Sequence, residues 1–395
     1  MTSDARMTEQ KSWRKRKSRF GCRNCKLRKL KCDETRPHCV RCRTYGVLCN
    51  FSLRVPDLQP LLEGRGEQDI AKRSALPPPR STISNAIWAD DGSTFYMLDV
   101  QDQELFIRFR HRTLHSLGGS AMVDIYEKHM LKASFTCPFL IHGTLAVAAA
   151  HNRYLGATHG RCLREYYHWS QCTILFNKWL SQSIKEEYKD LLWATAGSLA
   201  ILTFSSIHIR SHEQAWPLSA ADSSDLEWLR LGTGKSALRR LANPSRPNSV
   251  FCAMSEALSS MHQLPTARGA SGVPVELAQL CGLDEWSTQD NNPYFAVAHD
   301  LSRLLKLPRG ETSQRRILMV SSHMHGAFAT CLQEKDPVAL LLLCLWYTRA
   351  REKAWWIDQR ARFELPAICT YLQRHHKDNG IIQALIPWGE IRTLT

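Results

Sequence analysis

Six cysteines between residues 22 and 49 have the spacing of metal ligands. The segment has the pattern C-x2-C-x6-C-x6-C-x2-C-x6-C, formed by Cys22, Cys25, Cys32, Cys39, Cys42 and Cys49. A two-residue gap lets two thiolates reach one ion at the start of a helical turn. Six thiolates could serve one Zn²⁺ with two to spare, or two Zn²⁺ if two sulfurs bridge. The even spacing of the two half-sites favours two Zn²⁺.

This segment needs a metal in order to fold. A stretch of about thirty residues with few apolar side chains cannot build a core, so the metal must supply the folding energy. Six thiolates and two Zn²⁺ have a formal charge of −2, which surrounding Lys and Arg side chains can offset. The other eight cysteines lack C-x2-C spacing, and we expect them to be buried apolar residues in a reducing compartment.

The residues between the ligands favour DNA as the partner. Residues 26–31, Lys-Leu-Arg-Lys-Leu-Lys, predict a short cationic helix, whereas residues 43–48, Arg-Thr-Tyr-Gly-Val-Leu, carry one positive charge and a turn glycine. Arg or Lys donating to guanine O6 and N7 is the commonest specific major-groove contact. We therefore expect the first half to face DNA. The alternative is a zinc knot that holds protein instead.

The segment resembles the fungal binuclear zinc-cluster (Zn(2)-C6 fungal-type) transcription factors. It matches their motif at every ligand, through Arg28-Lys29-Leu30-Lys31-Cys32-Asp33, and at Pro37. The resemblance implies that Cys22 and Cys39 bridge two Zn²⁺. It also implies that each ion has two further ligands, Cys25 and Cys32 for one and Cys42 and Cys49 for the other.

The same resemblance implies DNA contacts for the charged residues of the segment. Lys29, with Arg28 beside it, would contact the bases of a CGG-like triplet. Phosphate contacts would come from Lys26, Lys31 and Arg43, and Pro37 would shape the loop that joins the two halves. The match covers about 30 of the 395 residues.

Positive charge is concentrated at the N-terminus. Residues 1–50 hold 15 Lys and Arg against four Asp and Glu, a net charge of +11 that leaves +4 for the rest of the chain. So local an excess indicates an anionic partner, here double-stranded DNA in the nucleus. We expect either a nuclear import signal or a phosphate-tracking arm, or both, from the basic run Arg14, Lys15, Arg16, Lys17 and Arg19.

Composition separates four zones. We predict a disordered basic arm at residues 1–20, the zinc cluster at 21–50, a flexible linker without heptad repeats at 51–98, and an all-α regulatory domain at 99–395. Apolar residues near a 3.6-residue period, beginning with Leu105 and Phe109, indicate the helices. The predicted fold class is therefore a small zinc-stabilised N-terminal DNA-binding cluster with short helices, linked to a large all-α C-terminal domain.

Residues 137–151 are similar to a helix of fungal regulators of the yeast sterol uptake control type, and the upstream residues 102–105, Asp-Gln-Glu-Leu, fit the same group. The resemblance implies a helical domain that binds a sterol in some members. Cys137 stands where His is usual, and Asn152-Arg153 follows where apolar residues are expected. An apolar effector is thus a candidate partner, beside transcription co-regulators.

Several other signals are discounted. The apolar runs at 141–150 and 338–347 are half the length of a membrane span, so we expect buried helices and no membrane span. The Gly-Thr-Gly-Lys-Ser sequence at 232–236 has Leu229 where a phosphate-binding loop needs Gly, and is interpreted as a helix start. The histidine pairs at 323 and 325 and at 375–376 are expected to be surface or core residues. No nucleophile, base and orienting group occur in motif spacing, so no enzyme is predicted.

The expected function is regulation of RNA polymerase II genes through CGG-like sites. The resemblances favour a biosynthetic (secondary-metabolite) gene cluster or sterol-related genes as targets. The alternative is a ligand-responsive sterol or lipid receptor whose helical domain gates DNA binding. The sequence leaves the oligomeric state open, because the factor could bind as a monomer or pair through its helical domain.

Overall fold

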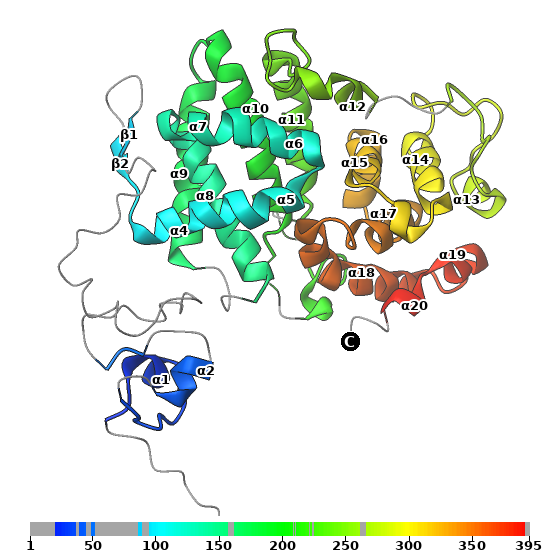
Figure 1. Cartoon of the computed structure of the whole chain (residues 1–395). Coiled ribbons are helices and arrows are strands. Elements are labelled where there is room, and N and C mark those ends of the chain that lie inside the picture. Colours follow the sequence, from blue (N-terminus) through cyan, green and yellow to red (C-terminus); the bar gives the residue numbers. More distant parts are fainter. Residues whose placement is uncertain are drawn as a thin grey trace, which may run out of the picture. The chain divides into compact units, whose positions relative to one another are not determined.

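A computed structural model divides the chain into two compact units, Met1–Thr82 and Ile83–Thr395 (Figure 1). The structure describes residues 20–36, 39–44, 49–51, 86–88, 95–156, 162–207, 209, 211–220, 222, 225–260 and 266–391. The basic run Arg14, Lys15, Arg16, Lys17 and Arg19, together with Pro37 and the side chain of Arg43, lies outside the described residues. The zone boundaries predicted at residues 20, 50 and 98 stay predictions.

In its described residues the first unit contains two five-residue helices, α1 (Arg23–Leu27) and α2 (Val40–Thr44). The prediction of a cationic helix over residues 26–31 is wrong, because α1 ends at Leu27. Lys29 adopts a left-handed conformation with φ 53°. The N–H of Leu30 donates to the carbonyl of Cys25, and the N–H of Lys29 to that of Lys26. This pair of bonds forms a Schellman turn, which ends the helix.

The second unit begins with a hairpin in the stretch predicted as linker. Strands β1 (Ala86–Trp88) and β2 (Phe95–Met97) pair antiparallel, with Ile87 opposite Tyr96. After Met97 the regular elements of the described chain are all helical, so the predicted fold class is confirmed. The first helix, α4 (Val100–Arg108), starts with a capping box between Asp99 and Asp102, which satisfies two backbone donors at its N-terminus.

Two helical runs follow, each containing a π-helical turn. The first continues α4 through η2 (Phe109–Thr113) into α5 (Leu114–Leu117), and it stops at the predicted Gly118. The second comprises α6 (Ser120–Ile125), η3 (Tyr126–Met130), α7 (Leu131–Ala133) and η4 (Ser134–Thr136). The central helices are α8 (Pro138–Tyr154), α9 (Leu163–Leu180), α10 (Glu186–Phe204) and α11 (Glu227–Ala242).

The C-terminal half is built from shorter helices around two long ones. Its elements are η5 (His212–Gln214), η6 (Cys252–Met254), α12 (Ser255–Ser260), α13 (Val275–Leu280), α14 (Phe295–Lys306), η7 (Arg309–Glu311), α15 (Gln314–Ser322), α16 (Ala327–Gln333), α17 (Pro337–Ala350), α18 (Trp355–His375), α19 (Gly380–Leu385) and α20 (Trp388–Ile391).

The core is centred on α8 and α17, the two apolar runs of the sequence. Pro138 opens α8, as predicted, and this helix is buried from Pro138 to Asn152 against α9 and α10. Helix α17 is also largely buried, and it packs against α18 (Figure 1). Among the described residues no single helix is long and apolar enough to cross a membrane; the bent pair Ser120–Thr136 and Pro138–Tyr154 meets that criterion only jointly, by length and composition.

A buried polar network joins the hairpin to α4, α8 and α9. Asp102 accepts from the hydroxyl of Tyr96 at 2.5 Å and from Nε2 of His168 at 3.0 Å, and Arg164 donates to the same carboxylate. The Nδ1 atoms of His168 and His142 are 2.8 Å apart. Burial, and next the charge of His168, lower the pKa of His142 to about 3. The network therefore contains a histidine that the folded state holds neutral.

This histidine makes the helical unit sensitive to acid. Because the pKa of His142 falls on folding from its ordinary 6.5 to about 3, its stabilising contribution is complete above pH 6.5 and is lost as the pH falls towards 3. From pH 7 to pH 5 we expect the free energy of unfolding to decrease by about 2 kcal/mol through His142 alone. Urea unfolding of the wild type and of His142→Gln at both pH values measures this. An equal loss in the two proteins would contradict the assignment.

Candidate metal centre and nucleic-acid interface

The six cysteines of the motif converge in the first unit. Their sulfur atoms form two groups of four, within each of which all four lie within 4.8 Å of one another. One group contains Cys25 and Cys32, the other Cys42 and Cys49, and both groups include Cys22 and Cys39. Each group could hold one metal ion, and the two shared sulfurs stand where a bridge between two ions would lie.

The distances between the sulfurs fit zinc. The Sγ atoms of Cys22 and Cys39 are 3.8 Å apart, those of Cys22 and Cys42 3.5 Å, and those of Cys25 and Cys39 3.7 Å. Four sulfurs placed tetrahedrally at the Zn–S distance of about 2.3 Å are about 3.8 Å from one another. A disulfide would require about 2.0 Å. The spacing therefore suits thiolates around metal ions and not disulfides.

These sulfurs replace a hydrophobic core. All six cysteines are at least 96% buried, and among the described residues Phe51 is the one partly buried apolar side chain that packs against them. Burial, followed by hydrogen bonds with neighbouring sulfurs, raises the pKa of the Cys25 and Cys42 thiols. A bound cation reverses this effect, because a coordinating thiol is deprotonated outright. The donor set of six thiols therefore fits two zinc ions.

Each C-x2-C pair lies at the start of a short helix, as its spacing predicts. Sγ of Cys22 accepts from the N–H of Cys25 at 3.4 Å at the start of α1. Sγ of Cys39 accepts from the N–H of Cys42 at 3.3 Å in α2. Because the second cysteine of each pair turns its amide towards the first, both thiolates of a pair are held on the same side of the helix start.

Two residues whose roles were not predicted from the sequence form hydrogen bonds within the cluster. The carboxylate of Asp33 accepts from the N–H groups of Val40 at 3.0 Å and Arg41 at 3.3 Å. Oδ1 of Asn50, which is fully buried, accepts from the N–H of Asn24 at 2.7 Å. Their common signal in the sequence is an Asp or Asn directly after the third cysteine of each half.

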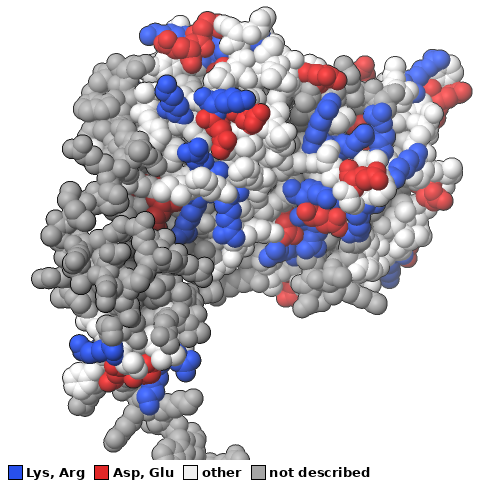
Figure 2. Space-filling view, viewed as in Figure 1, with Lys and Arg blue, Asp and Glu red and all other residues white. Residues whose placement is uncertain are grey.

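The predicted DNA-contacting residues differ in exposure. Lys26, Lys29 and Lys31 are exposed, and α1 with its Schellman turn carries the first two. Arg28 is half-buried, and its guanidinium donates to the carbonyl of Arg41 at 3.5 Å. In Figure 2 several Lys and Arg side chains project from the described part of this unit beside acidic side chains, and on the helical unit too both signs of charge are interspersed. The three lysine side chains are therefore exposed to solvent.

Comparison with known proteins identifies the cluster. Residues 20–57 match the fungal Zn(2)-Cys(6) binuclear cluster domain. The chain contains a Zn(2)-C6 fungal-type zinc-cluster domain. A Zn(2)-C6 fungal-type transcription factor of Aspergillus fumigatus is 23% identical over 82% of this chain and 83% of its own length. One of Gibberella zeae is 20% identical over 91% of this chain and 82% of its own length. The prediction that this chain is not an enzyme is therefore confirmed.

A third relative has a name that states a pathway. The cercosporin biosynthesis regulatory protein of Cercospora beticola is 34% identical to this zinc-cluster factor over 21% of the chain and 19% of its own length. The similarity to sterol uptake control regulators stays a prediction, as does each residue's role in metal or DNA binding.

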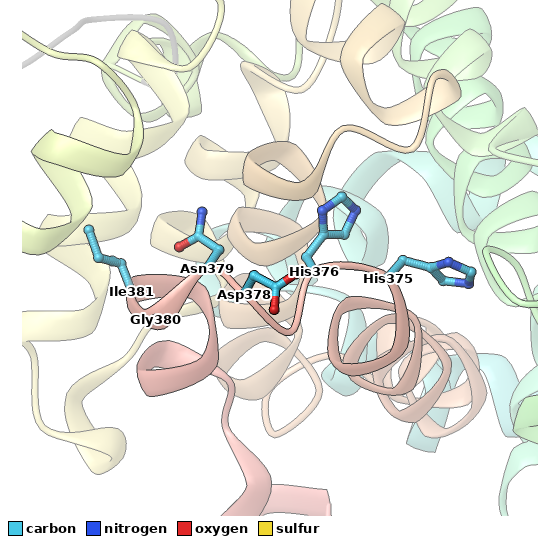
Figure 3. A pocket seen from close by; sticks show the side chains of 6 residues that line it. All are labelled: His375, His376, Asp378, Asn379, Gly380 and Ile381. Atoms are coloured by element: carbon cyan, nitrogen blue, oxygen red, sulfur yellow. The ribbon is translucent and has the colours of Figure 1, made fainter.

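The discounted signals supply no second metal centre. Among the described residues, groups of three or more His, Cys, Asp or Glu close enough to hold an ion occur only in the cysteine cluster. His375 and His376 lie beside a surface hollow of about 720 Å³ between α18 and α19, where their rings point in different directions (Figure 3). The helix start predicted at 232–236 is wrong, because this stretch lies inside α11.

Proposed function

We propose that this factor binds CGG-like triplets in double-stranded DNA through the first half of its cluster. In this proposal Cys22 and Cys39 bridge two Zn²⁺, one of which is completed by Cys25 and Cys32 and the other by Cys42 and Cys49. The observation that carries the proposal is the convergence of the six sulfurs at distances that suit two tetrahedral ions.

We assign base contacts to Lys29 and Arg28, and phosphate contacts to Lys26, Lys31 and Arg43. Three of these five, the lysines, are exposed on the α1 side of the cluster. Lys29 is held by the turn that ends α1, so its ammonium group is placed by a metal-bound scaffold rather than by a free chain. A lysine in this position can donate to guanine O6 and N7, whereas phosphate contacts carry no sequence information.

The genes under control are proposed to be a biosynthetic gene cluster transcribed by RNA polymerase II in the nucleus. Support comes from the relative named as a regulator of cercosporin biosynthesis. The helical unit would then be the regulatory module that meets co-regulators. The alternative, a sterol or lipid receptor, rests on the resemblance of residues 137–151, and saturable, stoichiometric binding of a sterol to the full chain would favour it.

Substitution of Lys29 tests the base contact. Glycine is used as the replacement because it adopts φ 53° without strain, so the turn that ends α1 is retained when the lysine side chain is removed. Lys29→Gly should weaken binding to a CGG-containing cognate site by about 1–3 kcal/mol and change binding to random DNA little. Titration of both DNAs with the full chain at several salt concentrations measures the two affinities.

Lys26→Ala is the matched control. If Lys26 contacts only phosphate, its loss should weaken binding to cognate and random DNA alike. It should also lower the slope of log affinity against log salt concentration by about one. Zinc content must be two per chain in each variant, so that the losses report contacts and not folding. Equal losses on cognate and random DNA for Lys29→Gly would place the specificity of the cluster elsewhere.

A further inference from the structure

We infer that Asn50 and Asp33 are positioning residues through which each half of the cluster caps the helix of the other half. Asn50 follows Cys49, the last cysteine of the second half, yet it binds the start of α1 in the first half. Asp33 follows Cys32, the last cysteine of the first half, yet it binds the start of α2. The cluster is thus held together by crossed caps as well as by the proposed shared sulfurs.

The two caps bind the same two amides of their helices but use different acceptor groups. At α1 the N–H of Arg23 donates to the Asn50 carbonyl at 3.4 Å, and the N–H of Asn24 donates to the Asn50 side chain at 2.7 Å. At α2 the N–H groups of its first two residues both donate to the Asp33 carboxylate. In each case the first two amides of a helix, which have no partner within it, are satisfied by one residue of the opposite half.

The burial of the two caps differs. Asn24 and Asn50 are fully buried, so the amide of Asn24 would lose its side-chain acceptor in a place that water does not readily reach. Asp33 is exposed, and water can replace part of its contribution. Asn50 therefore matters more, and it acts on the helix that leads into Lys29. This consequence for DNA recognition rests on the proposed function, whereas the crossed caps do not.

Amide hydrogen exchange of the full-length zinc-loaded chain, followed by mass spectrometry, tests the caps directly. Asn50→Ala should raise exchange in peptides that cover α1 by about two- to thirtyfold, the range expected for loss of a helix cap, and leave α2 unchanged. Asp33→Ala should raise exchange in α2 and leave α1 unchanged. Asn50→Asp keeps an acceptor oxygen and should retain the protection of α1.

The crossed pattern decides the inference. The inference would be overturned if each substitution raised hydrogen exchange in the helix of its own half, or in neither helix. Should Asn50→Ala lose zinc, Asn50→Asp decides: two zinc ions with wild-type exchange in α1 support the inference, and any other result overturns it.

A DNA titration separates this inference from the proposed function. At equal zinc content, Asn50→Ala should lose more affinity for a CGG-containing site than Asp33→Ala does, because Asn50 supports the half that is proposed to face DNA. Equal losses would overturn the positioning role of Asn50. If the wild type itself fails to distinguish CGG-containing from random DNA, the proposed function fails, and the exchange pattern still decides whether the caps cross.

Discussion

Chelation of zinc will unfold the cluster at residues 20–51 and abolish sequence-specific DNA binding, while the helical unit stays folded. Among the described residues, this cluster buries little apolar surface besides its own cysteines, whereas a structural Zn²⁺ site supplies about 10–16 kcal/mol. We expect affinity for the cognate site to fall at least about 10³-fold, to the level of non-specific binding. The helical unit can be followed separately by tryptophan fluorescence, because Trp13 is the only tryptophan before Trp88.

Two substitutions sharpen this experiment. Cys39→Ala removes a sulfur shared by both groups of four, and it should therefore reduce the zinc content below two and unfold the cluster. Cys162→Ser, which changes a half-buried cysteine of the helical unit, should leave two zinc ions per chain. A zinc content of one per chain in the wild type, or normal DNA binding by Cys39→Ala, would contradict the proposal that two sulfurs bridge two zinc ions.

The second large effect is expected in the helical unit. Glu364 is buried in α18, where it accepts from the hydroxyl of Tyr347 at 2.6 Å and from the guanidinium of Arg360 at 2.6 Å. Arg360 also donates to the carbonyls of Thr203, Phe204 and Ser206 at the end of α10. Glu364→Ala would leave this buried cation without its counter-charge. We expect a loss of about 3–5 kcal/mol in the free energy of unfolding, measured with urea.

An exposed ion pair provides the control. Lys128 and Asp124 are 3.5 Å apart with side chains 68% and 63% exposed, so Asp124→Ala should cost less than about 1 kcal/mol. Glu364→Gln keeps an acceptor for Tyr347, so its loss in the free energy of unfolding should lie between those of Glu364→Ala and Asp124→Ala. If Glu364→Ala were no more destabilising than Asp124→Ala, the buried pair would not hold α18 to α10.

The features that could be predicted from the sequence are those that depend on residues close together along the chain. The repeated C-x2-C-x6-C unit predicted the cluster because its ligands lie close along the chain. Pro138 and the apolar run behind it predicted α8 because its burial follows from composition. The end of α1 was missed, because a left-handed conformation at Lys29 is rare for a residue other than glycine.

Partners that are distant in the sequence could not be predicted. Asn50 binds Asn24 across 26 positions, and His168 binds Asp102 across 66. Such pairs form only after elements distant in the sequence pack together, so no local periodicity in the sequence predicts them. The neutral His142 is a further example, since its environment comes from α9 and the hairpin as well as from its own helix.

The bond from Arg360 to Phe204 has a consequence for the synthesis of the protein. The two residues are 156 positions apart, and the bond of Tyr154 to Asp358 spans 204. At about 5–20 residues per second, α18 leaves the ribosome about 8–30 s after α10 has been completed. During this interval the end of α10 and the face of α8 that α18 will cover are open to water. The helical unit therefore cannot complete its core until its last long helix has been synthesised.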